Sequence, residues 1–187
     1  MTPTLPLRDT PRVYGKITRA LHWSMAVLML FEFIGMGFKV LFGRDNPVAS
    51  FLGGWHGTIG ALLFVLIILR ILWALTNLGN RPDHGDGPLG LAAKAGHGLL
   101  YVLMFLVPFA ALARAYGSDR GFDLFGVQIF APKTTEIGWT SALGNFHGEM
   151  GWVMGAIILG HIAMVGVHES MWRDGTLAKM AGRKRRV

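Results

Sequence analysis

Four long apolar runs, separated by segments rich in Gly, Pro and Asp, dominate the pattern of hydrophobic and polar positions along the chain. The runs cover about residues 18–42, 53–75, 92–116 and 144–172. Each approaches or exceeds the roughly 20 residues that an α-helix needs to cross a bilayer, and the segments between them are typical of loops. The pattern predicts an all-α integral membrane protein, a single domain over residues 1–187 whose four spans form an up-and-down bundle.

The amino-acid composition supports a membrane protein. Hydrophobic residues make up 52% of the 187 residues and charged residues only 16%, against roughly 25% charged in soluble proteins. The 26 glycines would let helices approach each other or a flat ligand closely. The lack of cysteine excludes disulfides, c-type haem attachment and thiol catalysis.

Positive charge gathers near the ends of the chain and sets the expected orientation. The formal net charge is +7, and the positive-inside rule explains it better than nucleic-acid binding does. Basic residues flank the first and last runs and occur between the second and third: Arg8, Arg12, Lys16, Arg19, Arg81, Lys94, Arg173, Lys179, Arg183, Lys184, Arg185 and Arg186. We therefore expect both termini in the cytoplasm, a lipid bilayer around the spans, and no nucleic-acid partner.

The fourth run carries three histidines, His147, His161 and His168, spaced fourteen and then seven residues apart. On an α-helix these spacings bring all three to one face, with His147 and His161 about 21 Å apart along the axis. Ionisable side chains inside a membrane span are costly, so they are candidates for function. Two histidines at two depths on an inward face predict two stacked binding positions.

The other spans supply a partner at each depth. The second and fourth runs open with WHGTIG and FHGEMG, which places His56 and His147 near the outer surface. His22, in the first run, matches His161 near the cytoplasmic surface. Two bis-histidine sites are typical of a membrane di-haem b cytochrome, because haem iron accepts axial imidazoles. Gly60 and Gly151 each follow a proposed ligand by four residues, where a side chain would collide with a macrocycle.

Other interpretations of these histidines remain open at this point. A single membrane histidine is more often an interhelical hydrogen-bonding residue than a ligand. A zinc site would instead need its ligands clustered at one depth. His168 could replace His161 as the partner of His22, but the two haems would then lie about 32 Å apart. We prefer His161, because electron tunnelling falls steeply with distance.

Three further residues are candidates for binding a cofactor. Arg70 lies fourteen residues after His56, level with the inner site, where it could pair with a haem propionate or simply extend toward the cytoplasm. His97 and His168 should both lie near the cytoplasmic surface. A quinone headgroup needs hydrogen-bond partners and a proton route, which histidine provides; ordinary interface histidines are the alternative.

From about residue 14 to residue 186 the chain resembles the bacterial cytochrome b561 family of small four-helix membrane cytochromes. The matching motifs are LHW with His22, WHGTIG with His56 and the later Arg70, AGHGLLYVLMFLVP with His97, Phe125, Gly126 and then Pro132, FHGEMG with His147, and LGH with His161. The resemblance implies two haem b groups, ligated by His22, His56, His147 and His161. It also implies a bacterial inner membrane and electron exchange between its faces, with ubiquinone as one partner.

One branch of that family, similar to this chain in size and in its basic C-terminal tail, oxidises superoxide at the outer surface and reduces ubiquinone. We therefore expect a membrane oxidoreductase that takes electrons from superoxide, or from a periplasmic redox protein, and gives them to ubiquinone. Lys39 or Arg114 could guide superoxide electrostatically. The alternatives are a haem-b membrane anchor subunit, passing electrons between the quinone pool and a partner dehydrogenase or hydrogenase, and a histidine-lined metal transporter.

Overall fold

The computed structural model describes residues 6–182 and is built almost entirely from helices. The elements are α1 (Lys16–Phe42), α2 (Pro47–Leu75), α3 (Gly87–Gly117), β1 (Phe122–Leu124), β2 (Val127–Phe130), α4 (Gly138–Asn145), α5 (His147–Val167), the π-helix η1 (His168–Trp172) and α6 (Thr176–Ala181). The basic residues Arg183, Lys184, Arg185 and Arg186, used above to orient the chain, lie outside the described residues.

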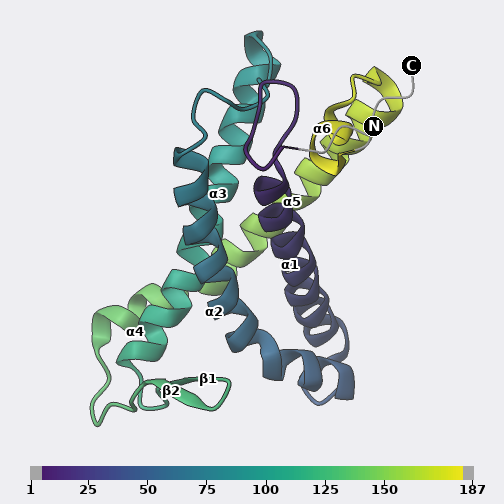
Figure 1. The fold of residues 1–187 in the computed structure, drawn as a ribbon. Coiled ribbons are helices and arrows are strands. Elements are labelled where there is room, and N and C mark those ends of the chain that lie inside the picture. Colours follow the sequence, from purple (N-terminus) through teal and green to yellow (C-terminus); the bar gives the residue numbers. More distant parts are fainter. Residues whose placement is uncertain (1–5, 183–187) are drawn as a thin grey trace.

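Four helical segments are long and apolar enough to cross a membrane: α1, α2, α3 and the continuous stretch Gly138–Trp172. Figure 1 shows them running up and down, with α4 and the β-hairpin at one end and the start of α1 beside α6 at the other. These ends are called the hairpin end and the terminal end. The predicted four-helix membrane bundle is confirmed.

Helix α2 begins several residues before its apolar run, because a capping residue outside the run defines its start. Asn46 caps α2, since its side chain accepts hydrogen bonds from the backbone N–H groups of Val48 and Ala49, and Pro47 occupies the first turn. At the other side of this turn, α1 stops at Gly43, whose φ of 82° suits glycine. The hydrophobic pattern therefore locates the spans but not the turns that continue them.

The segment predicted as a long loop after α3 contains a two-stranded antiparallel hairpin, in which Phe122 faces Phe130. The turn is formed by Phe125 and Gly126, with φ values of 51° and 82°. Positive φ at both central residues is typical of the tight turns that join twisted strands. Strands this short leave too weak an alternation of hydrophobic residues for the sequence to predict them.

The helices pack around a core that runs along the bundle axis. Its buried members are Met25, Met29, Leu63, Ile67, Leu103, Val107 and Met154. Within this bundle α1 packs on α2, and α5 makes its close backbone contacts with α3 and α4 but few with α1 or α2. The space between α5 and the α1–α2 pair is therefore left to side chains.

The terminal end is closed by polar contacts around the buried side chain of Asp9. Its carboxylate accepts hydrogen bonds from the backbone N–H of Gly15, at 2.8 Å, and from Arg81 Nε, at 3.1 Å. Arg19 donates to the carbonyls of Met180 and Ala181 at 2.7 and 2.6 Å. These bonds hold the segment before α1 against the loop after α2, and α6 against α1.

Gly117→Ala tests the closest helix contact at the hairpin end. A Cβ on Gly117 would lie 1.9 Å from Oγ1 and 2.9 Å from Cβ of the fully buried Thr140 in α4. We expect a loss of about 1–3 kcal/mol from overpacking, seen as a lower midpoint of thermal unfolding in detergent. Gly53→Ala is the control, because its Cβ would meet nothing within 4 Å. Equal midpoints for both variants and the wild type would contradict this packing.

Candidate functional site

Two pairs of histidines face each other inside the bundle, one pair toward each end. Toward the hairpin end, the ring centroids of His56 and His147 are 5.8 Å apart. Toward the terminal end, those of His22 and His161 are 6.4 Å apart. In each pair α5 supplies one ring, while α2 or α1 supplies the other across the space between the helices. The structure thus brings together the pairs that depth along the helices predicts.

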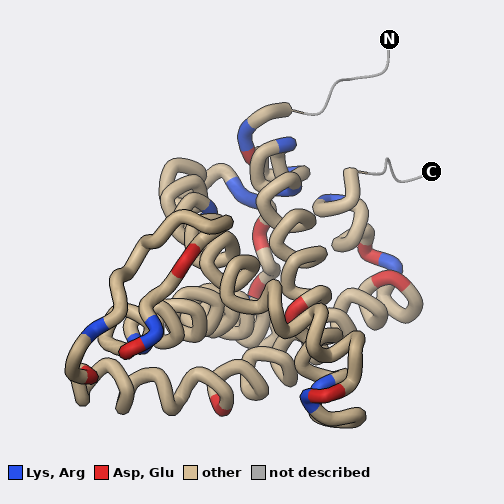
Figure 2. Tube along the Cα trace, turned by 90° about the horizontal axis from the view of Figure 1, so that it is seen from below, with Lys and Arg blue, Asp and Glu red and all other residues tan. Residues whose placement is uncertain are grey.

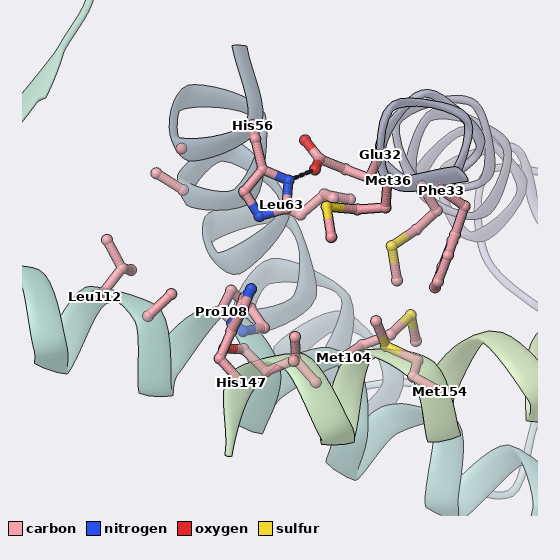
Figure 3. A pocket seen from close by; sticks show the side chains of 18 of the residues that line it. Glu32, Phe33, Met36, His56, Leu63, Met104, Pro108, Leu112, His147 and Met154 are labelled. Atoms are coloured by element: carbon pink, nitrogen blue, oxygen red, sulfur yellow. Dashed lines mark hydrogen bonds and ion pairs between the residues drawn. The ribbon is translucent and has the colours of Figure 1, made fainter. Parts of the chain in front are cut away.

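A cavity of about 270 Å³ opens between His56 and His147. Figure 3 shows both rings projecting into it, among methionine and other apolar side chains. Gly60 and Gly151 line this cavity, and a Cβ on either would meet no atom within 4 Å. The room beside both glycines therefore belongs to the cavity, as expected if the two positions leave space for a flat ligand.

The ring of His147 is held by the backbone of α3. Its Nδ1 lies 2.9 Å from the carbonyl oxygen of Val107. A carbonyl only accepts hydrogen bonds, so Nδ1 carries the proton and donates it. In a neutral ring this leaves the lone pair on Nε2, which is the nitrogen available to a metal.

The ring of His56 is held by Glu32, a residue of α1 that sequence reasoning missed. Oε2 of Glu32 contacts Nδ1 of His56, as the dashed line in Figure 3 marks. Within residues 6–182, neither carboxylate oxygen of Glu32 has a hydrogen-bond partner besides this ion-pair contact. A glutamate in the middle of an apolar run was the available signal, since such residues are costly in a membrane.

At the terminal end, the histidine pair meets a cation instead. Nη2 of Arg70 lies 3.1 Å from Nδ1 of His22, and Nε donates to the hydroxyl of Tyr101 at 3.1 Å. Because a guanidinium can only donate, Nδ1 of His22 is the acceptor in this contact. Arg70 is half-buried within the bundle, level with His22 as its spacing from His56 predicts.

His97 extends the terminal-end cluster toward the surface. Its ring centroid is 5.2 Å from that of His161 and 4.9 Å from that of His84, and its Nδ1 donates to the carbonyl of Ala93 at 2.7 Å. Burial, together with nearby His97 and Lys94, lowers the pKa of His84 below its usual value. Sequence reasoning assigned His84 no role, because its loop lies outside the apolar runs.

His168 is engaged elsewhere. Its Nδ1 lies 2.6 Å from Oδ2 of Asp174, and its ring packs edge-on against Trp172. Burial acts to raise the pKa of Asp174, but hydrogen bonds from His168 and Thr176 lower it to about 2. The structure therefore pairs His168 with an ionised carboxylate at the end of the last span, rather than with His22 or His97.

The geometry of both pairs suits an iron held between two imidazoles. With metal–nitrogen bonds of about 2 Å and roughly 1 Å from each nitrogen to its ring centre, two axial imidazoles have centroids about 6 Å apart. The observed values are 5.8 and 6.4 Å. Within residues 6–182, no three His, Asp or Glu side chains cluster to hold a metal ion. The donor set thus fits a haem better than a zinc-type site.

Comparison with known proteins points the same way. The family model described as "Prokaryotic cytochrome b561" matches residues 13–183. "Cytochrome b561 homolog 2" of Escherichia coli (strain K12) is 27% identical over 186 residues, which cover 94% of each chain. "Cytochrome b562" of Cereibacter sphaeroides is 32% identical over 113 residues, covering 58% of this chain and 70% of that protein.

Gly151→Leu tests whether the hairpin-end cavity holds a ligand. The new side chain would occupy the open space beside Gly151, so we expect the purified protein to retain much less haem at this end, measured by absorbance per chain. Gly166→Leu is a control on the same helix, because Gly166 is exposed and its Cβ would also meet nothing within 4 Å. Wild-type haem content in Gly151→Leu would show that the cavity is not the binding site.

Proposed function

The chain belongs to the prokaryotic cytochrome b561 family of haem b membrane electron-transfer proteins, and we propose that it carries electrons between two haems at opposite ends of its bundle. His56 and His147 would hold one haem, and His22 and His161 the other. The observation that carries this proposal is the pair of facing imidazoles at each of two depths, spaced for an intervening iron.

The residues around the hairpin-end pair orient its histidines and leave space for a haem. When bound, haem supplies a one-electron couple whose potential depends on its axial ligands, their hydrogen bonds and the surrounding polarity. The carbonyl of Val107 fixes the ring of His147 so that Nε2 faces the cavity. Gly60 and Gly151 keep the flanking space clear, and the side chains around them are mostly apolar.

Arg70 is the proposed partner of a haem propionate at the terminal end. A neutral His22 that binds metal through Nε2 carries its proton on Nδ1, which can no longer accept from Arg70. The guanidinium would then leave His22 and remain, half-buried, close to the ligand. A planar fork of donors suits a carboxylate well, so a propionate is the natural new partner.

Ubiquinone is the proposed acceptor, and the surroundings of His97 are its proposed site. The ring of His97 contacts the ring of His161 on one side and that of His84 on the other. His84 belongs to the loop outside the membrane-spanning helices. This row of imidazoles offers hydrogen bonds to a headgroup beside the terminal-end haem and a proton route from water. The pairing of His168 with Asp174 makes His168 the weaker candidate for the same role.

Superoxide is the proposed donor at the hairpin end, although overall charge there gives no strong attraction. The charged residues at this end are Lys39, Arg44, Arg114, Arg120 and Lys133, against Asp45, Asp119, Asp123, Glu136 and Glu149. Figure 2 shows basic and acidic residues interspersed over the bundle. Guidance of an anion would therefore depend on individual groups such as Lys39 and Arg114, as the sequence predicts, rather than on net charge.

Substitution of single histidines tests the two-haem arrangement. We expect wild type to bind two haems per chain and His56→Ala or His147→Ala to bind one, because a haem that loses an axial imidazole is weakly held. His22→Ala and His161→Ala should lose the other haem. Haem per chain is measured from the pyridine adduct, with His84→Ala as a histidine control that keeps both. Two haems in all four ligand variants would contradict the assignment.

Rapid mixing of the purified protein with superoxide tests the donor and acceptor. We expect the haem α-band of ferrous protein to grow on mixing, and to decay when ubiquinone is added as the electron passes on. Superoxide dismutase in the same mixture should abolish the first step. If only ubiquinol reduces the haem, electrons flow in the opposite direction to the one proposed. If the haem is reduced only when a partner dehydrogenase or hydrogenase is present, the protein is better described as an anchor subunit.

A further inference from the structure

Glu32 is a buried carboxylate to which the functions described above give no role. It lies within α1, and only 10% of its side chain is exposed. The cavity lining around it consists of methionine, phenylalanine, glycine and other apolar residues together with the two histidines, and includes no Lys or Arg. An anionic group is costly in such surroundings unless it is paired, and the partner that the structure provides is His56.

We propose that Glu32 is a positioning residue for His56 that also makes the hairpin-end haem the lower-potential one of the two. This inference rests on the proposed function, because it requires His56 to be a haem ligand. The direction of electron flow, from the hairpin end to the terminal end, would then be set by the residues that contact the ligands and not by the ligands themselves.

Glu32 fixes the orientation of the His56 ring. A carboxylate accepts the Nδ1–H, which fixes both the tautomer and the ring plane and leaves the lone pair on Nε2. Figure 3 shows the opposite edge of this ring turned into the cavity, toward His147. Glu32 from α1 therefore holds a ring from α2 in the position needed to bind a metal.

Glu32 also makes His56 a stronger electron donor to a bound metal. A histidine that donates its proton toward a carboxylate becomes a more basic ligand, and a nearby negative charge favours the ferric over the ferrous state. His147, the other ring of this pair, donates only to the neutral carbonyl of Val107. The lowering of the potential at the hairpin end would therefore come from Glu32 alone.

The terminal end has the opposite charge beside its histidine pair. His22 faces the cation Arg70, at 3.1 Å, where His56 faces an anion. A guanidinium close to a haem favours the ferrous state, and Arg70 would remain near the haem after it leaves Nδ1 of His22. One electron moving from the hairpin-end site to the terminal-end site then goes to the higher potential. Two such transfers, with two protons taken up from water, convert a quinone to a quinol.

The test is a redox titration of Glu32→Gln. Glutamine keeps the shape and can accept from His56 Nδ1 through its amide oxygen, but it removes the charge. We expect two haems per chain and an upward shift in the potential of one of them. The ferric-to-ferrous ratio at a fixed potential should fall at least tenfold, which is about 59 mV for a one-electron couple. The electron paramagnetic resonance signal of the same ferric haem should also change.

Three controls identify the haem and the cause. Glu149→Gln removes an exposed carboxylate two residues from His147 and should leave both potentials unchanged. Glu32→Asp keeps the charge, so this variant should have a potential close to that of the wild type. In a His161→Ala background that retains only the hairpin-end haem, Glu32→Gln should shift the single remaining potential.

Each outcome bears on a separate claim. Wild-type protein with fewer than two haems defeats the proposed function itself. Wild type with two haems, and Glu32→Gln with two haems at unchanged potentials, defeats only the role of Glu32. Glu32→Gln could also lose one haem. In that case, the presence of both haems in Glu32→Asp supports the positioning role, and the loss of the same haem from Glu32→Asp overturns it.

Discussion

The cost of placing polar side chains in a hydrocarbon environment governs the arrangement of this bundle. An ionisable group away from water must be paired, and its partner then fixes where it points. Glu32 is paired with His56, and Arg70 contacts both His22 and Tyr101. The same contacts that lower the cost of burial orient the imidazoles. The contacts that make these groups tolerable inside the bundle are therefore the same contacts that shape the site.

Glycine has two opposite uses in the same bundle, and the difference explains how a packed membrane protein keeps room for a large cofactor. At Gly117 and Gly155 a Cβ would clash with Thr140 or with the ring of Phe33, so these glycines allow close packing. At Gly60 and Gly151 a Cβ would meet nothing. The sequence shows only that glycine is abundant; the positions four residues after His56 and His147 identify those that line a cavity.

The sequence predicts the four spans and the two histidine pairs because both depend on regular periods: apolar runs of membrane length, and a fourteen-residue spacing that returns to one helix face. Contacts that depend on how helices rotate against each other are not predictable from a run that is apolar on all sides. The contact between Glu32 and His56 was not predictable for this reason, although a glutamate inside an apolar run was itself a signal. His168 follows His161 at helical spacing, but it begins the π-helical turn η1, in which the helical register changes, and it faces Asp174.

In the proposed two-haem arrangement both ends have the same pair of imidazole ligands, which raises the question of how the two haems would acquire different properties. Bis-imidazole ligation alone cannot do so, since both sites would then have the same donors. The carbonyl of Val107 is neutral, whereas Glu32 and Arg70 carry opposite charges and contact one proposed ligand each, His56 and His22. Because charge acts over a longer range in a medium of low polarity, one buried anion and one half-buried cation would distinguish the two ends. A symmetrical set of ligands can thus support transfer in one preferred direction.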